Sequence, residues 1–485
     1  MQSDLSGSLN LFLKKSYQNK KIKIPESENP IYFSNQKVKP YLEASLDSNL
    51  AKIILDEFKG SFHITLNKHH FLQAAERGMD YDSSNYDAIW VRDSIWGYFY
   101  FKAFDQNRAY QLIYQLFLYY QSETQIKRFK DIIKNPQKKN DLMAVPHIRF
   151  NAKDPCFLDV QVNGKDQIWN HKQNDAHGLF LIALFDAFNC HILKFNEFKD
   201  NTIQLIELFF GFFETIDYTN YEDSGSWEEI ERVNTSSIGL VAQSAYLWKT
   251  FAKKNNIQFK ANLNHLYLKG LEKVKCQLTQ GGESPGYPKT SLKYRTSDIA
   301  LLHLLAPYPL EGLNFNESKL IFEIIKPLIK SHGVIRYIND SYQAANFWLN
   351  IYQKENLTDD TSSEHAFSNR NQNMLKNTEA QWFFDSLIAL ALINFYNKFP
   401  QQLEKETIKK QSAYHIKRAL SQLTQNSFTI AADGTMIKEN QLPESINTVI
   451  LNNKTYFLPS PITPLNWAKA SLSLALKNFS DSFKN

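Results

Sequence analysis

Two glutamates in aromatic surroundings, Glu228 and Glu444, are the residues of this sequence best suited to acid–base chemistry. Glu228 follows Trp227, and Glu444 follows Pro443, whose fixed backbone favours a rigid loop. Two carboxyl groups that face one sugar can cleave a glycosidic bond, because one protonates the leaving oxygen while the other activates water or attacks the sugar. The two glutamates lie 216 positions apart (444 − 228), so only a closed fold can bring them together.

The acidic neighbour Glu229 and the ring of Trp227 predict that one of the two adjacent glutamates has a raised pKa and the other an ordinary one. An apolar wall and a nearby negative charge both disfavour ionisation of a carboxyl group. A carboxylic acid that stays neutral at the working pH can protonate a glycosidic oxygen. The alternative interpretation is an ordinary solvated pair of glutamates.

A polar cluster between residues 86 and 94 leads directly into a helical pattern. Tyr86 and Trp90 stand beside Arg92 and Asp93, so fixed donors and acceptors could hold sugar hydroxyls while an aromatic face stacks on the ring. The alternative role of Asp93 is to cap the helix that follows.

Three further clusters combine aromatic and polar residues in the same way. Trp169 and Asp175 precede a strongly apolar helical segment, where Asp175 either caps the helix or binds a ligand. Arg336 could pair with a structural acid or grip a sugar hydroxyl. Trp467 opens the last helical pattern, after a loop rich in proline.

Apolar stripes with helical spacing recur along most of the chain and predict about thirteen helices, among them 71–77, 379–396 and 406–425. Strand patterns are few, at 62–66, 333–337 and 427–432. The segments 179–185 and 205–210 are apolar nearly all round, which requires burial on most sides, whereas 406–425 has a polar stripe. We therefore predict an all-α toroid with an inner and an outer ring of helices, minor β hairpins, and long loops that build a pocket at one end.

The chain contains no linker rich in Pro, Gly or Ser, so a single domain is predicted. Within it, residues 1–80 carry no readable motif and are expected to form a helical or extended lead-in that packs on a barrel of residues 81–485.

Composition is that of a globular protein, with 43% hydrophobic and 22% charged residues among 485. A net charge of +5 is too dilute to indicate nucleic acid, and no apolar run approaches the ~20 residues of a membrane span. Three cysteines without paired spacing suggest a reducing compartment and no zinc site, and His69-His70 lack metal-ligand partners. These features, with no recognisable signal peptide, predict a soluble cytoplasmic protein without metal or cofactor, and leave the oligomeric state open.

Taken in order, these clusters resemble glycoside hydrolase family 15, the glucoamylases and glucodextranases, and the related N-terminal domain of phosphorylase kinase α/β subunits. The similarity extends from Tyr86 to the C-terminus. It implies an (α/α)6 barrel, a six-hairpin toroid, and an inverting exo-acting enzyme that releases glucose from the non-reducing ends of α-glucans or maltooligosaccharides. Glu228 would be the general acid and Glu444 the general base, about 6.5–9.5 Å apart so that water fits between them.

The same resemblance implies roles for the remaining clusters. Arg92, Asp93 and Arg336 would hold the terminal glucose, Tyr86 and Trp169 would stack against it, and Glu229 would add a contact behind the acid. The substrate-binding set implied in this way comprises Tyr86, Trp90, Arg92, Asp93, Trp169, Asp175, Trp227, Glu229, Arg336 and Trp467.

The chain also departs from the family pattern. Residues 230–233 lengthen the piece after the acid, as in the kinase subunits, and Ser445 follows Glu444 where hydrolases often carry Gln. Glu379, within a predicted helix, is a rival base. Two alternatives to the α-glucan hydrolase stay open: a regulatory module that binds glucan without cleaving it, and a trehalose-type disaccharide hydrolase on the same barrel.

Overall fold

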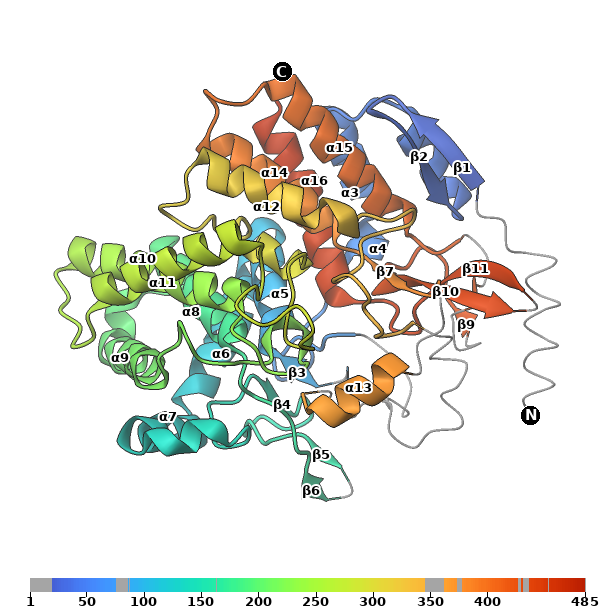
Figure 1. The fold of residues 1–485 in the computed structure, drawn as a ribbon. Coiled ribbons are helices and arrows are strands. Elements are labelled where there is room, and N and C mark those ends of the chain that lie inside the picture. The colour runs from blue at the N-terminus through green and yellow to red at the C-terminus, as the bar shows by residue number, and fades with distance from the viewer. Residues whose placement is uncertain are drawn as a thin grey trace.

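The fold is dominated by helices, with short strands at the edges (Figure 1). It is known from a computed structural model, which describes residues 20–75, 86, 88–162, 164–344, 362–372, 377–425, 429–430, 436–451 and 453–484.

Six helical elements form a closed inner ring. They are almost wholly buried, and each contacts the next around the ring until the last contacts the first. In order, they are α5 (Val91–Phe104), α8 (Asn174–Asn189), α10 (Thr235–Asn255), η5 (Ile299–Leu304), α14 (Asp385–Lys398) and α16 (Asn466–Ser482). A helix that is buried on every side has no need of a polar face, which explains the apolar run of α8.

Six further helices alternate with the inner ones along the chain and form an outer layer. They are α3 (Ser48–Glu57), α6 (Gln106–Gln121), α9 (Lys199–Ile216), α11 (Leu263–Gln280), α12 (Phe315–Ile325) and α15 (Lys405–Ser421). Each outer helix carries the chain back, so the inner elements run parallel and begin at the same end. This alternation makes the fold an (α/α)6 barrel, as the family resemblance implies.

Inner and outer helices begin differently. Four outer helices start with a side-chain cap: Asp47 for α3, Asp105 for α6, Asn262 for α11, and a capping box of Asn314 with Glu317 for α12. The inner helices α5, α8, α10, α14 and α16 have no side-chain cap from their own N-cap residue. Their first backbone N–H groups therefore need acceptors from elsewhere.

One such acceptor comes from the neighbouring loop at each helix start, except at α14, where the donor is Phe383, the residue before the N-cap. At each inner N-terminus, a backbone N–H donates to the loop that enters the next inner element, and the pattern continues around the whole ring. The six hydrogen bonds are Val91 N to Ile148 O (3.0 Å), Asn174 N to Asp223 Oδ2 (2.8 Å), Thr235 N to Glu283 O (2.9 Å), Ile299 N to Arg336 O (2.9 Å), Phe383 N to Glu444 O (3.3 Å) and Asn466 N to Ala74 O (2.9 Å). The loops at this end are thus fixed to one another through the helices.

Shorter elements complete the fold. The remaining helices are η1 (Gln36–Val38), α2 (Lys39–Glu43), α4 (Lys59–Phe62), α7 (Glu123–Lys134), η2 (Pro136–Asn140), η3 (Phe195–Glu197), η4 (Gly225–Trp227), η6 (Lys326–Leu328) and α13 (Glu364–Gln372). Antiparallel pairs join β1 (Lys20–Ile24) to β2 (Ser27–Phe33), β3 (Ile89–Trp90) to β4 (Arg149–Phe150), β5 (Gln161–Val162) to β6 (Lys165–Asp166), and β8 (Thr429–Ile430) to β9 (Met436–Ile437). A three-stranded sheet has the order β11 (Lys454–Pro459), β10 (Ser445–Leu451), β7 (Ala380–Trp382).

The N-terminal segment packs on the C-terminal part of the chain, and its helix α3 is itself an outer helix, so the barrel includes residues before 81. Strand β2 contacts α15, and α3 contacts α16. The buried Asn35 side chain donates to the Thr424 carbonyl at 2.7 Å. Figure 1 shows this blue segment beside the orange and red helices.

Some local expectations were wrong. Residues 71–75 are not helical, because Gln73 and Ala75 form isolated bridges with Ile89 and Leu465; 76 and 77 lie outside the described residues. The predicted helix 379–396 begins as strand β7 and becomes helical only at Asp385. Residues 333–337 make isolated bridges instead of a strand, and 63–66 are irregular. Of 427–432, only the short strand β8 is described.

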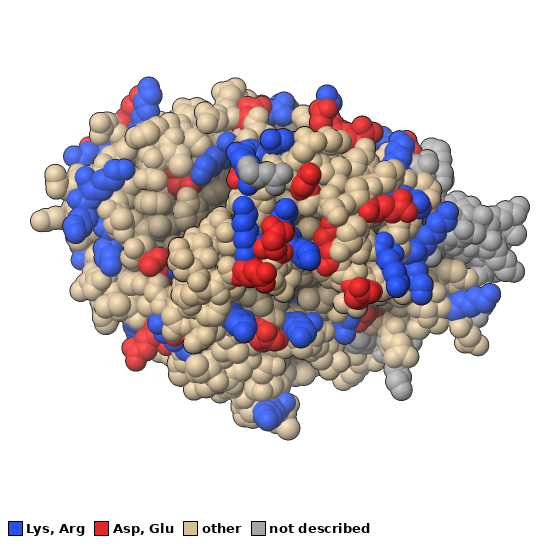
Figure 2. Space-filling model, turned by 90° about the horizontal axis from the view of Figure 1, so that it is seen from above, with Lys and Arg blue, Asp and Glu red and all other residues tan. Residues whose placement is uncertain are grey.

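Charged side chains of both signs are interspersed on the face shown in Figure 2, with no single basic patch. Over the described ranges, no helix is both long and apolar enough to cross a membrane.

We expect Gly178→Ala to lower the free energy of unfolding by about 1–3 kcal/mol, the usual cost of overpacking a core. A Cβ atom at Gly178 in α8 would lie 2.8 Å from the Leu240 carbonyl carbon in α10, and backbone at such a contact cannot move aside cheaply. Urea unfolding followed by circular dichroism measures the change. Gly60→Ala in α4 is the matched control, since its Cβ would meet nothing within 4 Å. Equal stability of the two variants would contradict this view of the packing.

Candidate active site

The loop that carries Glu228 leads into the inner helix α10. A two-way backbone bridge between Asp223 and Arg232 closes the loop at its base. Glu228 ends the short helix η4 with a left-handed backbone (φ 57°), and this turn sends the side chains of Glu228 and Glu229 into different surroundings. We call residues 223–232 the acid loop.

Arg92, at the start of α5, connects Glu228 to the rest of the site. Its Nε donates to Asp175 Oδ2 at 2.7 Å, its Nη2 to Gln173 Oε1 at 2.7 Å, and its Nη1 lies 3.3 Å from Glu228 Oε1. Ser226 Oγ also donates to Asp175 Oδ2, at 2.8 Å. Burial alone would raise the pKa of Asp175, but Arg92 holds it below its usual value. The first turns of α5 and α8 and the acid loop are therefore bound together by one guanidinium group.

Asp93 and Asp175 are not the N-cap residues of their helices. Trp90 occupies that position in α5 and Gln173 in α8, and both aspartates lie in the first turn. Instead of capping its own helix, Asp175 binds Arg92 and Ser226, so its carboxylate serves the site and not only the helix end.

Glu444 lies in the loop before β10 and is only 2% exposed. The hydroxyl of Tyr86 donates to its Oε1 at 2.5 Å, and the amide nitrogen of Gln343 donates to its Oε2. Burial raises the pKa of Glu444 to about 7, against the lowering effect of these two hydrogen bonds. Tyr342 completes the cluster, since its hydroxyl lies 3.2 Å from that of Tyr86.

The pKa values of Glu228 and Glu444 are both affected by one further carboxyl group, that of Asp93. Burial raises the pKa of Glu228 to about 7 although Arg92 opposes the rise, and the charge of Asp93 raises the pKa of Glu228 and of Glu444. Asp93 itself has a pKa raised to about 6 by burial. The fold thus brings the two distant glutamates within electrostatic reach of one carboxyl group at the same end of the barrel.

Glu229 has the opposite environment from its neighbour Glu228. It is fully buried, and its two carboxylate oxygens accept hydrogen bonds from Arg295 (3.0 Å), Arg336 (2.9 Å), Arg370 (2.5 Å) and Tyr337 (2.7 Å). Burial would raise the pKa of Glu229, but the guanidinium groups hold it far below its usual range. The sequence predicted one raised and one ordinary pKa. The structure shows one raised and one strongly lowered, because the arginines come from distant segments.

Arg336 lies among aromatic rings. Its guanidinium carbon is 5.3 Å from the centre of the Trp227 ring, 4.7 Å from Tyr342 and 5.1 Å from Trp382. Asp340 accepts two hydrogen bonds from Arg336, at 2.6 and 2.7 Å. The indole N–H of Trp227 is held by Asp298 at 2.8 Å. The sequence left two roles open for Arg336, pairing with a structural acid or gripping a sugar hydroxyl. The structure shows the pairing, with Asp340 and Glu229 as the acids.

The other predicted aromatic residues are divided between two places. Trp90 and Trp169 meet edge to face at 5.4 Å, with Arg149 lying over both rings. Trp467 lies elsewhere, stacked on Trp96 and His303. The buried indole nitrogens of Trp90, Trp169 and Trp467 have no hydrogen-bond partner. Unsatisfied buried donors are uncommon in folded proteins and are typical of sites that meet water or a ligand.

Sequence reasoning missed Arg295, Asp298, Gln343 and Arg370. Arg295 and Asp298 precede η5 in a polar segment like those before the other inner helices, and that signal could have found them. Gln343 and Arg370 have no such signal. The rival base Glu379 is not helical; it precedes strand β7, and its carboxylate accepts from Gln381 at 2.9 Å.

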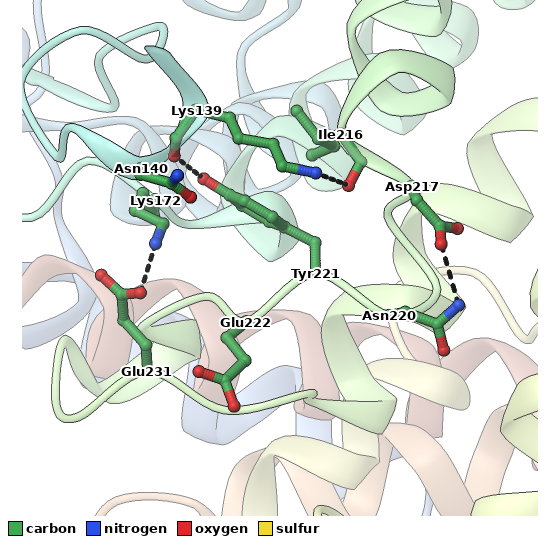
Figure 3. A pocket seen from close by; sticks show the side chains of 9 residues that line it. All are labelled: Lys139, Asn140, Lys172, Ile216, Asp217, Asn220, Tyr221, Glu222 and Glu231. Atoms are coloured by element: carbon green, nitrogen blue, oxygen red, sulfur yellow. Dashed lines mark hydrogen bonds and ion pairs between the residues drawn. The ribbon is translucent and has the colours of Figure 1, made fainter. Parts of the chain in front are cut away.

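A pocket of about 340 Å³, whose lining includes neither Glu228 nor Glu444, is lined in part by Glu231 of the acid loop (Figure 3). Glu231 of the acid loop forms an ion pair there with Lys172, whose ammonium group also lies 4.9 Å from the centre of the Tyr221 ring. Asn170 donates to Glu231 as well, at 2.9 Å. These contacts fasten the acid loop to the loop before α8. Within the described parts of the chain, no three His, Cys, Asp or Glu side chains gather closely enough to hold a metal ion.

Comparison with known proteins identifies a relative. No protein-family model matches the chain. The uncharacterized lipoprotein YgeQ of Escherichia coli is 34% identical over 187 residues, which are 37% of this chain and 68% of YgeQ. The chain belongs to the same family as YgeQ. The description as a lipoprotein applies to YgeQ and is not carried over to this chain.

Solved structures with the same fold are glycosidases and glucoamylases. A glycosidase variant in complex with glucose has a TM-score of 0.51 and 15% identity, covering 90% of this chain and 100% of its own. Glucoamylase from Hormoconis resinae has a TM-score of 0.55 and 12% identity, covering 90% of this chain and 74% of its own. At these identities the comparison shows the fold, so the glucoamylase-like barrel implied by the resemblance is confirmed.

We expect Glu229→Gln to destabilise the protein by about 3–5 kcal/mol, because removing one partner of a buried ion pair leaves charges uncompensated, here three guanidinium groups. Chemical denaturation at pH 7 measures the loss. Asp481→Asn is the matched control, since Asp481 pairs with Lys477 at an exposed site, where an ion pair contributes at most about 1 kcal/mol. A loss below 1 kcal/mol for both variants would refute a structural role for this cluster.

Proposed function

We propose that this protein is an inverting, exo-acting glycoside hydrolase that releases glucose from the non-reducing ends of α-glucans or maltooligosaccharides. Glu228 is the general acid and Glu444 the general base. The single observation that carries the proposal is a pair of carboxyl groups at one end of an (α/α)6 barrel, Glu444 buried and Glu228 partly buried, both with a pKa raised to about 7. Solved glycosidases and glucoamylases on the same fold support the reaction class.

The chemistry assigned to each glutamate follows from its surroundings. Glu228 keeps a side-chain exposure of 20%, while Glu444 is more enclosed and is held by two donors. A general acid must reach the leaving oxygen and stay protonated, whereas a general base must be ionised and held in line with a water molecule. Arg92, Asp93 and Arg336 are proposed to hold the terminal glucose, with Tyr86, Trp90, Trp169, Trp227 and Trp467 as the aromatic surroundings and Asp175 and Glu229 as buried supports.

The proposed compartment is the cytoplasm. The three cysteines, Cys156, Cys190 and Cys276, are exposed and form no disulfide, as in reducing compartments. The relative YgeQ is named a lipoprotein, a property that is not proposed for this chain.

We expect the protein to release glucose from maltotriose with the β-anomer appearing first, as proton NMR records directly. Glu228→Gln and Glu444→Gln should each lower the rate by about 10²–10⁴-fold, the usual contribution of a positioned acid or base. The two variants should separate on α-glucosyl fluoride. Fluoride leaves without protonation, so Glu228→Gln should retain most of its activity on this substrate while Glu444→Gln should not.

Three outcomes separate the candidate functions. Oligosaccharide binding without turnover, equal in wild type and Glu228→Gln, would favour the sugar-sensing module. Turnover of trehalose but not maltotriose would assign a disaccharide hydrolase. Release of α-glucose would contradict inversion.

We also expect kcat/KM to follow a narrow bell centred near pH 7. Glu444 must be ionised, so activity falls as the pH drops through its pKa; Glu228 must be protonated, so activity falls as the pH rises through its own. Because both pKa values are raised to about 7, the acid and alkaline limbs of the profile lie close together. Their apparent pKa values then describe the two glutamates jointly and not either residue alone. Initial rates on maltotriose between pH 4 and 10 provide the profile, and on α-glucosyl fluoride the alkaline limb should vanish in Glu228→Gln. An optimum near pH 4.5 or a broad plateau would contradict these assignments.

A further inference from the structure

The two oxygens of Glu444 are held by donors from different parts of the chain. Tyr86, which precedes α5, donates to Oε1, and Gln343, which follows the segment of Arg336 and Asp340, donates to Oε2. Gln343 is 101 residues from Glu444 in the sequence and is only 1% exposed. A hydrogen bond at this depth has little competition from bulk water.

The orientation of the Gln343 amide is fixed from its other end. Its Oε1 accepts from Asn447 Nδ2 at 3.0 Å and lies 3.1 Å from the Ser445 hydroxyl, which is also 2.6 Å from Asn447 Oδ1. An amide oxygen can only accept and an amide nitrogen can only donate. Since Asn447 presents a donor to the oxygen, the nitrogen of Gln343 must face Glu444.

The backbone at Gln343 is unusual as well. Its φ of 58° lies in the left-handed region, which costs a residue other than glycine free energy. The contacts of the amide with Glu444, Ser445 and Asn447 compensate for this cost. A residue that only fills the core needs neither a left-handed backbone nor an amide bonded to a candidate base. The two features together therefore indicate a role for Gln343 beyond packing.

We propose that Gln343 is a positioning residue for Glu444, orienting its carboxylate and stabilising the ionised form that the base requires. The catalytic meaning of this role rests on the proposed function, whereas the contact itself does not.

The choice of an amide has a chemical reason. Glu229 shows what guanidinium partners do in this barrel, because three arginines hold its pKa far below the usual range and so make it a weak base. A neutral amide and a phenol hydroxyl hold a carboxylate in place with less effect on its basicity. Glu444 therefore keeps a pKa near the pH at which it must accept a proton.

The test is a carboxyl carbon-13 NMR titration of protein labelled at glutamate, with Glu444→Gln used to assign the Glu444 signal. Gln343→Met keeps the length of the side chain but has no N–H donor. Loss of one hydrogen bond to a charged group should move the Glu444 midpoint upward by about one pH unit. The matched control is Gln125→Met, which removes another buried amide that bonds Tyr119 and His147, and it should leave the midpoint unchanged.

A milder variant, Ser445→Ala, provides a second test in case Gln343→Met does not fold. Ser445→Ala removes one contact of the Gln343 amide and should move the midpoint in the same direction by less. In kinetics, the acid limb of kcat/KM should shift with the titration while KM changes little. An unchanged Glu444 midpoint in folded Gln343→Met, or in Ser445→Ala if the first variant does not fold, would overturn the assignment. Absence of turnover in the wild type would refute the hydrolase and leave the titration result valid.

Discussion

The start of each inner helix is bonded to the loop that enters the next one, and this cycle of six hydrogen bonds is the constraint on which the site depends. Helix N-termini carry unpaired N–H groups and a partial positive charge, so some acceptor has to be found for them. Most outer helices use their own side chains. The inner helices use neighbouring loops, and those loops carry Arg336 and Glu444 themselves and the segment of Glu228. Satisfying the backbone and placing the site are therefore one process.

The same end of the barrel contains carboxyl groups in two electrostatic conditions. Asp175 and Glu229 are buried against guanidinium groups and have lowered pKa values, whereas Glu228, Glu444 and Asp93 are buried with less compensation and have raised ones. Burial raises the pKa in all five cases, so the number and closeness of cationic partners decides the outcome. Glu228 and Glu229 are adjacent in the sequence, yet their pKa values are shifted in opposite directions.

Local patterns predicted the helical toroid and pointed to several residues of the candidate site. The apolar run of α8 predicted its burial, and aromatic residues beside polar ones before a helix marked Arg92, Asp175 and Glu228. The similar run of α9 was misleading, because α9 is an outer helix in which Glu207 and Leu208 are only partly buried. Predictions failed where a distant partner decides the structure. Residues 71–75 look helical but pair with Ile89 and Leu465, and Glu229 needed Arg370, 141 positions away. Gln343 has no local signal, since its role arises only when its loop meets the loop of Glu444.

The contact between the N-terminal segment and α16 joins two distant parts of the chain. Asn466 bonds the carbonyls of Ala74 and Gln73, and Leu465 bridges Ala75. Helix α16 is the last inner helix in chain order, yet it covers the flanks of both α5 and α14. During translation, a chain without this helix has an open ring with apolar flanks. Such intermediates are prone to aggregate, and the ring can close only after α16 has left the ribosome.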